Sequence, residues 1–257
     1  MLKKGVQFGL NTSILLALFA AGFSFGLHKN WSENKLFSLA VFFSILGVYN
    51  FHRWYKFKKK QVQPLLEKWV QKNKKSIILS SFIGLFSSCS LFLYLLRLHP
   101  KLILLLAICF LISLLYVLLK LRELPFIKAL IVSFIWTFVL VILPAVLQKN
   151  YEHSNWSFLL LFYALTIPAD ARDLETDAKK FNTLPQLIGK QAAYSMSLLC
   201  ISVFVISQNF LLSQKFYLII LITIAIILFY ELENKQKIRV EWFDALLVLF
   251  GCLLYSC

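Results

Sequence analysis

Three of the four aspartates of this chain lie within eight residues of one another. Asp170, Asp173 and Asp177 follow the spacing i, i+3 and i+7, so on a helix that advances ~100° per residue they share one face within about 60°. Three like charges at this spacing repel one another and weaken a helix, unless a cation lies among them. Carboxylate oxygens suit Mg²⁺, which is typically bound by one or two carboxylates together with substrate phosphates. The spacing therefore favours a magnesium site formed by these three aspartates.

The same aspartates have an explanation that needs no metal. Pro168 is expected to end the preceding helix, and Asp170 would then cap a new helix while solvent screens the other carboxylates. Arg172, Lys179 and Lys180 would neutralise the cluster. The spacing by itself leaves both interpretations open.

The composition shows in what kind of protein these aspartates lie. Of the 257 residues, 60% are hydrophobic and only 15% are charged, and the mean hydropathy is +0.75. Soluble domains are close to half apolar and a quarter charged, so an ordinary soluble globule is excluded, and so is a disordered chain. At ~20 residues per span, the apolar blocks supply about nine transmembrane helices. We therefore expect an all-α fold, a polytopic membrane helical bundle that forms one integral membrane domain over residues 1–257.

Nine segments are expected to cross the membrane. They are residues 8–27, 36–51, 76–96, 102–119, 127–147, 156–167, 193–212, 216–230 and 242–257. Pro144 is expected to kink the fifth segment. The sixth, eighth and ninth segments are short, so a count of eight is the alternative.

The basic residues predict the orientation of these segments. The net charge is +15, and 21 of the 27 Lys and Arg fall on the side of the N-terminus when nine spans are assumed. Positive residues concentrate in cytoplasmic loops, so we expect a cytoplasmic N-terminus and a place in the bacterial inner membrane. Anionic membrane lipids, and no nucleic acid, are the expected partners of this charge.

Two cytoplasmic loops stand out, at residues 52–75 and 168–192. The first is basic, and its apolar residues recur at helical spacing, which predicts an amphipathic surface helix. These residues are Val62, Leu65, Leu66, Trp69 and Val70. The loop is expected either to set the topology and contact lipid headgroups, or to attract a diphosphate group. The second loop holds the three aspartates.

The aspartate loop resembles a known signature. Asp170-x-x-Asp-x-x-x-Asp177, followed by Thr183-Leu-Pro-Gln-Leu-Ile-Gly-Lys190, is similar to the second aspartate-rich motif of the UbiA family of intramembrane prenyltransferases. Tyr116-x-x-x-Lys120 resembles another feature of that family, near the end of its fourth helix. The resemblance implies a nine-helix bundle with a cytoplasmic active site.

The resemblance also implies an activity and a set of site residues. The chain would be an enzyme that transfers a polyprenyl group from polyprenyl diphosphate to a lipid-soluble acceptor, aromatic or quinone-like, with Mg²⁺ held by the three aspartates. Contacts with the diphosphate would come from Asn50, Arg53, Lys120, Arg122 and Arg172. No catalytic base can be named.

One part of the family pattern differs. The family's first motif repeats acids after an Asn-Asp pair, whereas residues 49–56 read Tyr-Asn-Phe-His-Arg-Trp-Tyr-Lys. Asn50 matches, but Phe51 and Trp54 stand where acids are expected. Either basic side chains bind the diphosphate directly, or the chain is a non-catalytic relative that binds isoprenoid, lipid or a partner protein. A transporter is disfavoured because the expected spans are nearly free of ionisable residues.

Overall fold

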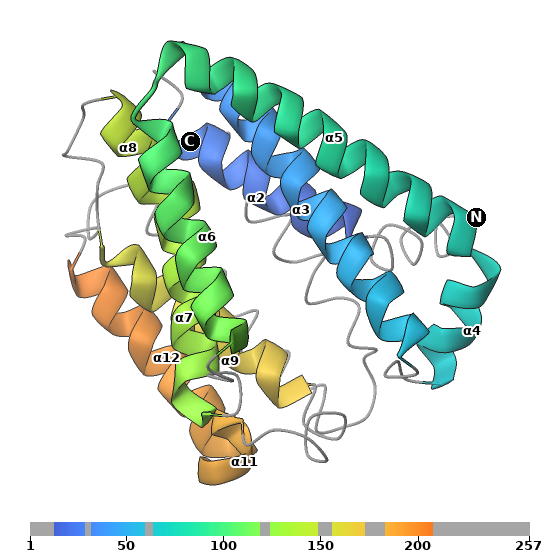
Figure 1. Cartoon of the computed structure of the whole chain (residues 1–257). Coiled ribbons are helices and arrows are strands. Elements are labelled where there is room, and N and C mark those ends of the chain that lie inside the picture. Colours follow the sequence, from blue (N-terminus) through green and yellow to red (C-terminus); the bar gives the residue numbers. More distant parts are fainter. Residues whose placement is uncertain are drawn as a thin grey trace. The chain divides into compact units, whose positions relative to one another are not determined.

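The structure, a computed structural model, describes residues 13–28, 32–59, 64–118, 124–148, 156–172 and 183–207. All regular secondary structure in these ranges is helical (Figure 1), which confirms the all-α class for this part of the chain. Four described helices are long and apolar enough to cross a membrane: α3 (Asn34–Lys58), α5 (Lys74–Leu98), the helix Phe126–Gln148 and α12 (Lys190–Ser207). The expected spans 216–230 and 242–257 lie outside the described residues, and the count of nine spans stays a prediction.

The described helices belong to two compact units that meet in sequence between His99 and Pro100. The first unit holds α2 (Ile14–Leu27), α3, α4 (Pro64–Lys72) and α5. The second unit holds α6 (Leu102–Leu118), α7 (Pro125–Thr137), η2 (Phe138–Ile142), α8 (Leu143–Gln148), α9 (Phe158–Arg172), α11 (Leu184–Ile188) and α12.

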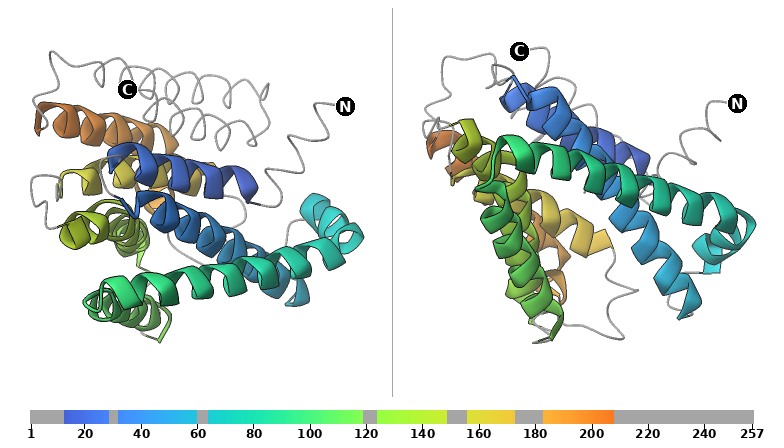
Figure 2. Two further views of the ribbon diagram at one scale, coloured as in Figure 1. Left: turned by 90° about the horizontal axis from the view of Figure 1, so that it is seen from above. Right: turned by 45° about the horizontal axis from the view of Figure 1, so that its top comes forward.

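In the first unit, α3 and α5 form a close antiparallel pair, which Figures 1 and 2 show side by side. Their backbones nearly touch where Gly47 faces Gly84, since a Cβ on Gly84 would lie 2.7 Å from the backbone nitrogen of Gly47. Ser81 Oγ donates to the Gly47 carbonyl at 3.3 Å, and Asn50 Nδ2 donates to Ser80 Oγ at 3.0 Å. Small residues and inter-helix hydrogen bonds hold helices together in lipid, where apolar burial gives no driving force between them.

The first basic loop is more helical than expected. α3 continues past residue 51 to Lys58, and α5 begins at Lys74, so only a short connection and α4 remain between them. Residues 52–59 contain neither Gly nor Pro, and good helix formers such as lysine let the helix continue. α4 confirms a helix in the loop, but Val70 is fully buried in protein while Lys68 and Lys72 are exposed. The side chains of Leu65 and Leu66, and all of Val62, lie outside the described part.

In the second unit, the expected kink at Pro144 takes the form of a π-helical turn. η2 ends two residues before this proline, and the Leu143 N–H donates to the carbonyl of Phe138, five residues back. In α-helical register, the proline ring would collide with the carbonyl of Leu140. One wider turn moves the backbone out of that register, as π-bulges do.

The expectation that Pro168 ends the sixth helix is wrong. α9 runs through Pro168 to Arg172. Proline has no N–H, so the carbonyl of Ala164, four residues back, loses its helical donor. Ser197 Oγ of α12 supplies a donor instead, at 2.6 Å from the Ala164 oxygen. Asp170 therefore lies inside α9 and does not cap a new helix.

Candidate functional site

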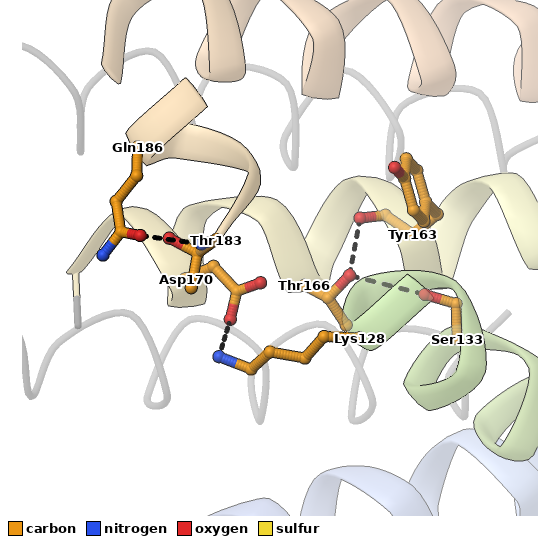
Figure 3. A network of polar contacts seen from close by, with 7 residues as sticks. All are labelled: Lys128, Ser133, Tyr163, Thr166, Asp170, Thr183 and Gln186. Carbon is orange, nitrogen blue, oxygen red and sulfur yellow. Dashed lines mark hydrogen bonds and ion pairs between the residues drawn. The ribbon is translucent and has the colours of Figure 1, made fainter. Parts of the chain in front are cut away.

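A buried ion pair joins the first turn of α7 to the last turn of α9 (Figure 3). Lys128 Nζ lies 2.7 Å from Asp170 Oδ1, and the two side chains are only 15% and 10% exposed. Asp170 reaches this position because α9 continues beyond Pro168. Removing either partner would leave an uncompensated charge away from water, which is strongly unfavourable. The pair therefore neutralises the first aspartate of the cluster within the second unit.

The sequence by itself did not pair these two residues. In the interpretation without a metal, Arg172, Lys179 and Lys180 neutralise the cluster, whereas Lys128 falls at the start of the expected span 127–147 and has no predicted partner. It lies 42 positions before Asp170 in the chain. The available signal was a lysine one turn inside an otherwise apolar helix, because a charge at such a position needs a partner.

The segment that follows the aspartates folds against the end of α9 that carries the ion pair. Thr183 is the residue immediately before α11, and its backbone N–H donates to Gln186 Oε1 at 2.8 Å. This is one half of a capping box. Leu184 is buried in a small apolar cluster with Ile167 and Ala193, which attaches α11 to α9 and α12. The Thr-Leu-Pro run thus has a local structural explanation as a helix start.

Gly189 separates α11 from α12. Its φ is +83°, a backbone conformation that L side chains rarely adopt. Two helices can therefore follow each other directly, with α12 beginning at Lys190. The glycine at the end of the signature thus has a geometric role, because it allows α12 to begin immediately after α11.

A second polar contact between α7 and α9 lies about one turn further into the helices (Figure 3). Ser133 Oγ and Thr166 Oγ1 are 3.4 Å apart. Each hydroxyl also donates within its own helix, Ser133 to the Ala129 carbonyl at 2.7 Å and Thr166 to the Tyr163 carbonyl at 2.8 Å. A hydroxyl carries a single proton, and these bonds within the helices use both protons, so the 3.4 Å approach of the two oxygens is a polar contact next to the ion pair and not a further hydrogen bond.

Two of the expected diphosphate contacts lie in the first unit. Asn50 is fully buried, and its Nδ2 donates to Ser80 Oγ of α5. Arg53 Nη1 donates to Asn50 Oδ1 at 3.5 Å. The amide of Asn50 therefore holds α3 against α5, which is a role in packing that its match to the family motif did not indicate.

The remaining expected site residues are described only in part. Tyr116 lies in α6 and Arg172 at the end of α9, but their side chains are not described. Lys120, Arg122, Asp173 and Asp177 lie outside the described residues. The convergence of these groups on one site stays a prediction.

Of the three aspartates expected to bind Mg²⁺, the structure describes Asp170. The described residues contain no group of three or more His, Cys, Asp or Glu side chains that could hold a metal, but two of the three expected ligands lie outside them. A carboxylate offers about four lone-pair sites, so one ammonium contact does not use all of them. Carboxylate oxygens are ligands that Mg²⁺ takes, and ligation of a metal by Asp170 together with Asp173 and Asp177 stays a prediction.

Comparisons with known proteins assign no family to the chain. No family model matches it, and no curated protein and no solved structure is significantly similar to it. The resemblance to the UbiA family therefore depends on residues 170–190 and on Tyr116-x-x-x-Lys120.

Proposed function

We propose that this chain is a membrane-embedded prenyltransferase of the UbiA type. It would transfer a polyprenyl group from its diphosphate to a lipid-soluble, aromatic or quinone-like acceptor. The observation that carries the proposal is the buried Lys128–Asp170 pair, with the Thr183 segment of the same signature folded against α9. Ionisable residues among apolar helices are rare and mark functional sites by default. The proposal includes nine spans, a cytoplasmic N-terminus and the bacterial inner membrane.

The proposed roles follow from charge. Asp170, Asp173 and Asp177 would hold Mg²⁺, and Lys128 would act as a positioning residue that fixes the Asp170 carboxylate. Bound Mg²⁺ would neutralise the negative charge that develops on the departing diphosphate. Arginine and lysine side chains would bind the diphosphate oxygens, arginine through two parallel N–H donors. These are Arg53, Lys120, Arg122 and Arg172.

The proposal is tested by enzyme assay. Membranes that contain the protein are given labelled polyprenyl diphosphate, a lipid-soluble acceptor extract and Mg²⁺. The unsubstituted protein is expected to release diphosphate and to label the acceptor, and Asp173→Asn to lower the rate at least about tenfold. Glu175→Gln is the matched control and should keep the rate, because helical spacing would turn residue 175 away from the three aspartates. Equal release of diphosphate by the unsubstituted protein and by Asp173→Asn would refute the proposed enzymatic activity.

A non-catalytic relative is the second candidate. The Asn50 amide is engaged with Ser80 between two helices, and Phe51, which stands where the family has an acid, is 48% exposed. This arrangement leaves the first motif without carboxylates. The second candidate predicts that the protein retains labelled polyprenyl diphosphate in a filter-binding assay but releases no diphosphate from it.

A further inference from the structure

The exposed face of α3 changes character over its last turns. Val48 and Phe51 are exposed and apolar, Tyr55 follows, and Lys58 and Lys59 complete the series. The series spans about 15 Å along the helix axis. It matches the order of layers in a bilayer, from hydrocarbon through the aromatic belt to the headgroups.

The two lysines lie against aromatic rings. Lys58 Nζ is 4.6 Å from the ring centroid of Trp54, and Lys59 Nζ is 4.8 Å from that of Tyr55. Cation–π contacts of this kind leave the charge intact while limiting where the ammonium can lie. Both cations are therefore held at the depth of the interfacial aromatics.

α5 shows the same order from the same end. Lys74 and Lys75 are exposed at its start, and Leu79, Phe82 and Phe86 are exposed along the following turns. The bond between Asn50 and Ser80 places this end of α5 next to the last turns of α3. At this end of the first unit both helices thus have exposed lysines followed by exposed apolar residues, which is the order expected at a membrane surface.

The charge at this level has one sign. Lysines of α4 add to those of α3 and α5, and Glu67 is the one acid among residues 51–75. We propose that this basic corner, defined as Lys58, Lys59, Lys68, Lys72, Lys74 and Lys75, docks the headgroups of anionic phospholipids, with acyl chains along the exposed apolar residues of α3 and α5. Juxtamembrane lysines attract anionic leaflets electrostatically. The site is independent of the proposed enzyme.

The test measures lipid retention by the purified full-length protein. The protein in neutral detergent is titrated with phosphatidylglycerol or phosphatidylcholine, and bound lipid is counted by native mass spectrometry. The unsubstituted protein should prefer phosphatidylglycerol. The double variant Lys58→Gln, Lys59→Gln should weaken phosphatidylglycerol binding about tenfold and leave phosphatidylcholine binding unchanged. Lys58→Arg, Lys59→Arg should keep the preference, since charge and ring contact are conserved.

Controls distinguish this site from other charges. Arg97→Gln, Lys101→Gln removes the same charge near the other end of α5 and should have no effect, and Asp173→Asn should also leave lipid binding unchanged. Equal binding by the unsubstituted protein and the Lys58→Gln, Lys59→Gln variant would overturn the proposal, and so would an equal loss in the Arg97→Gln, Lys101→Gln control. Displacement of the lipid by excess inorganic pyrophosphate would overturn it too, because the corner would then be a site for soluble diphosphate.

Discussion

Two polar contacts of this protein join side chains of different helices. Lys128 neutralises Asp170 from another helix, and Asn50 bonds to Ser80 across the α3–α5 interface. In surroundings that contain little water, each partner satisfies a group that would otherwise be left unsatisfied. The net contribution of such a pair to stability is small, because desolvation offsets attraction, whereas the loss of a single partner is severe.

This asymmetry gives a testable expectation for the ion pair. Lys128→Met and Asp170→Asn should each lower the free energy of unfolding by about 3 kcal/mol. The double variant should lose much less than the sum of the two single losses, because it leaves neither charge without its partner. The measurement is the midpoint of thermal unfolding in detergent, with the exposed Lys74→Met as control. Additive losses would show that the two side chains do not interact.

The glycine contact between α3 and α5 is equally specific. Gly84→Leu places side-chain atoms where the backbone of Gly47 lies, so the helices must separate, at a loss of about 1–3 kcal/mol or more. Ser90→Leu adds comparable bulk at an exposed position of the same helix and should be neutral. The midpoints of thermal unfolding of the two variants are compared. Equal midpoints for Gly84→Leu and Ser90→Leu would contradict the close contact between α3 and α5.

At the scale of elements, two prolines lie inside helices that do not end there. Before Pro144 the helix widens into a π turn. Beyond Pro168 α9 continues, because Ser197 of α12 donates a hydrogen bond to the carbonyl that the proline leaves without a donor. The first adjustment is made within the helix, whereas the second depends on a neighbouring helix. Asp170 lies two residues past Pro168, so its place in α9 depends on this continuation.

A double-mutant cycle tests whether Ser197 compensates for the N–H that Pro168 lacks. Ser197→Ala should destabilise the protein by about 1 kcal/mol, since it leaves the Ala164 carbonyl without its donor. In a Pro168→Ala background, residue 168 regains an N–H for that carbonyl, and Ser197→Ala should then have little effect. The free energies of unfolding of the four proteins give the coupling. An equal effect in both backgrounds would rule out this compensation.

At the scale of the whole molecule, the charge distribution sets the expected topology. Twenty-one of 27 basic residues fall on one side if nine spans are present, and loss of one span would scatter them. Four of the described helices are long enough to cross. The nine-span arrangement is therefore a prediction that depends on charge and hydropathy together.

Reporter fusions test that arrangement. A reporter active only in the cytoplasm, fused after residue 60, 122 or 180, should be active, and one fused after residue 100 or 150 should be silent. A periplasmic phosphatase fused at the same positions should give the opposite pattern. Cytoplasmic activity after residue 150 would exclude the nine-span order.

The sequence determined the helical class, the approximate position of each described span and the strong basic character, because hydropathy and charge are local properties of the chain. It also drew attention to Asp170 and to the Thr183-Leu-Pro segment, but not to the helix that begins there. The tertiary structure decided which groups meet: Gly47 with Gly84, Asn50 with Ser80, Lys128 with Asp170, and Ser197 with Ala164. These partners are 30 or more residues apart, and no local pattern encodes them. For the same reason the continuation of α9 through Pro168 was not predictable, since a helix normally broken by proline persists only where another helix supplies the missing hydrogen bond.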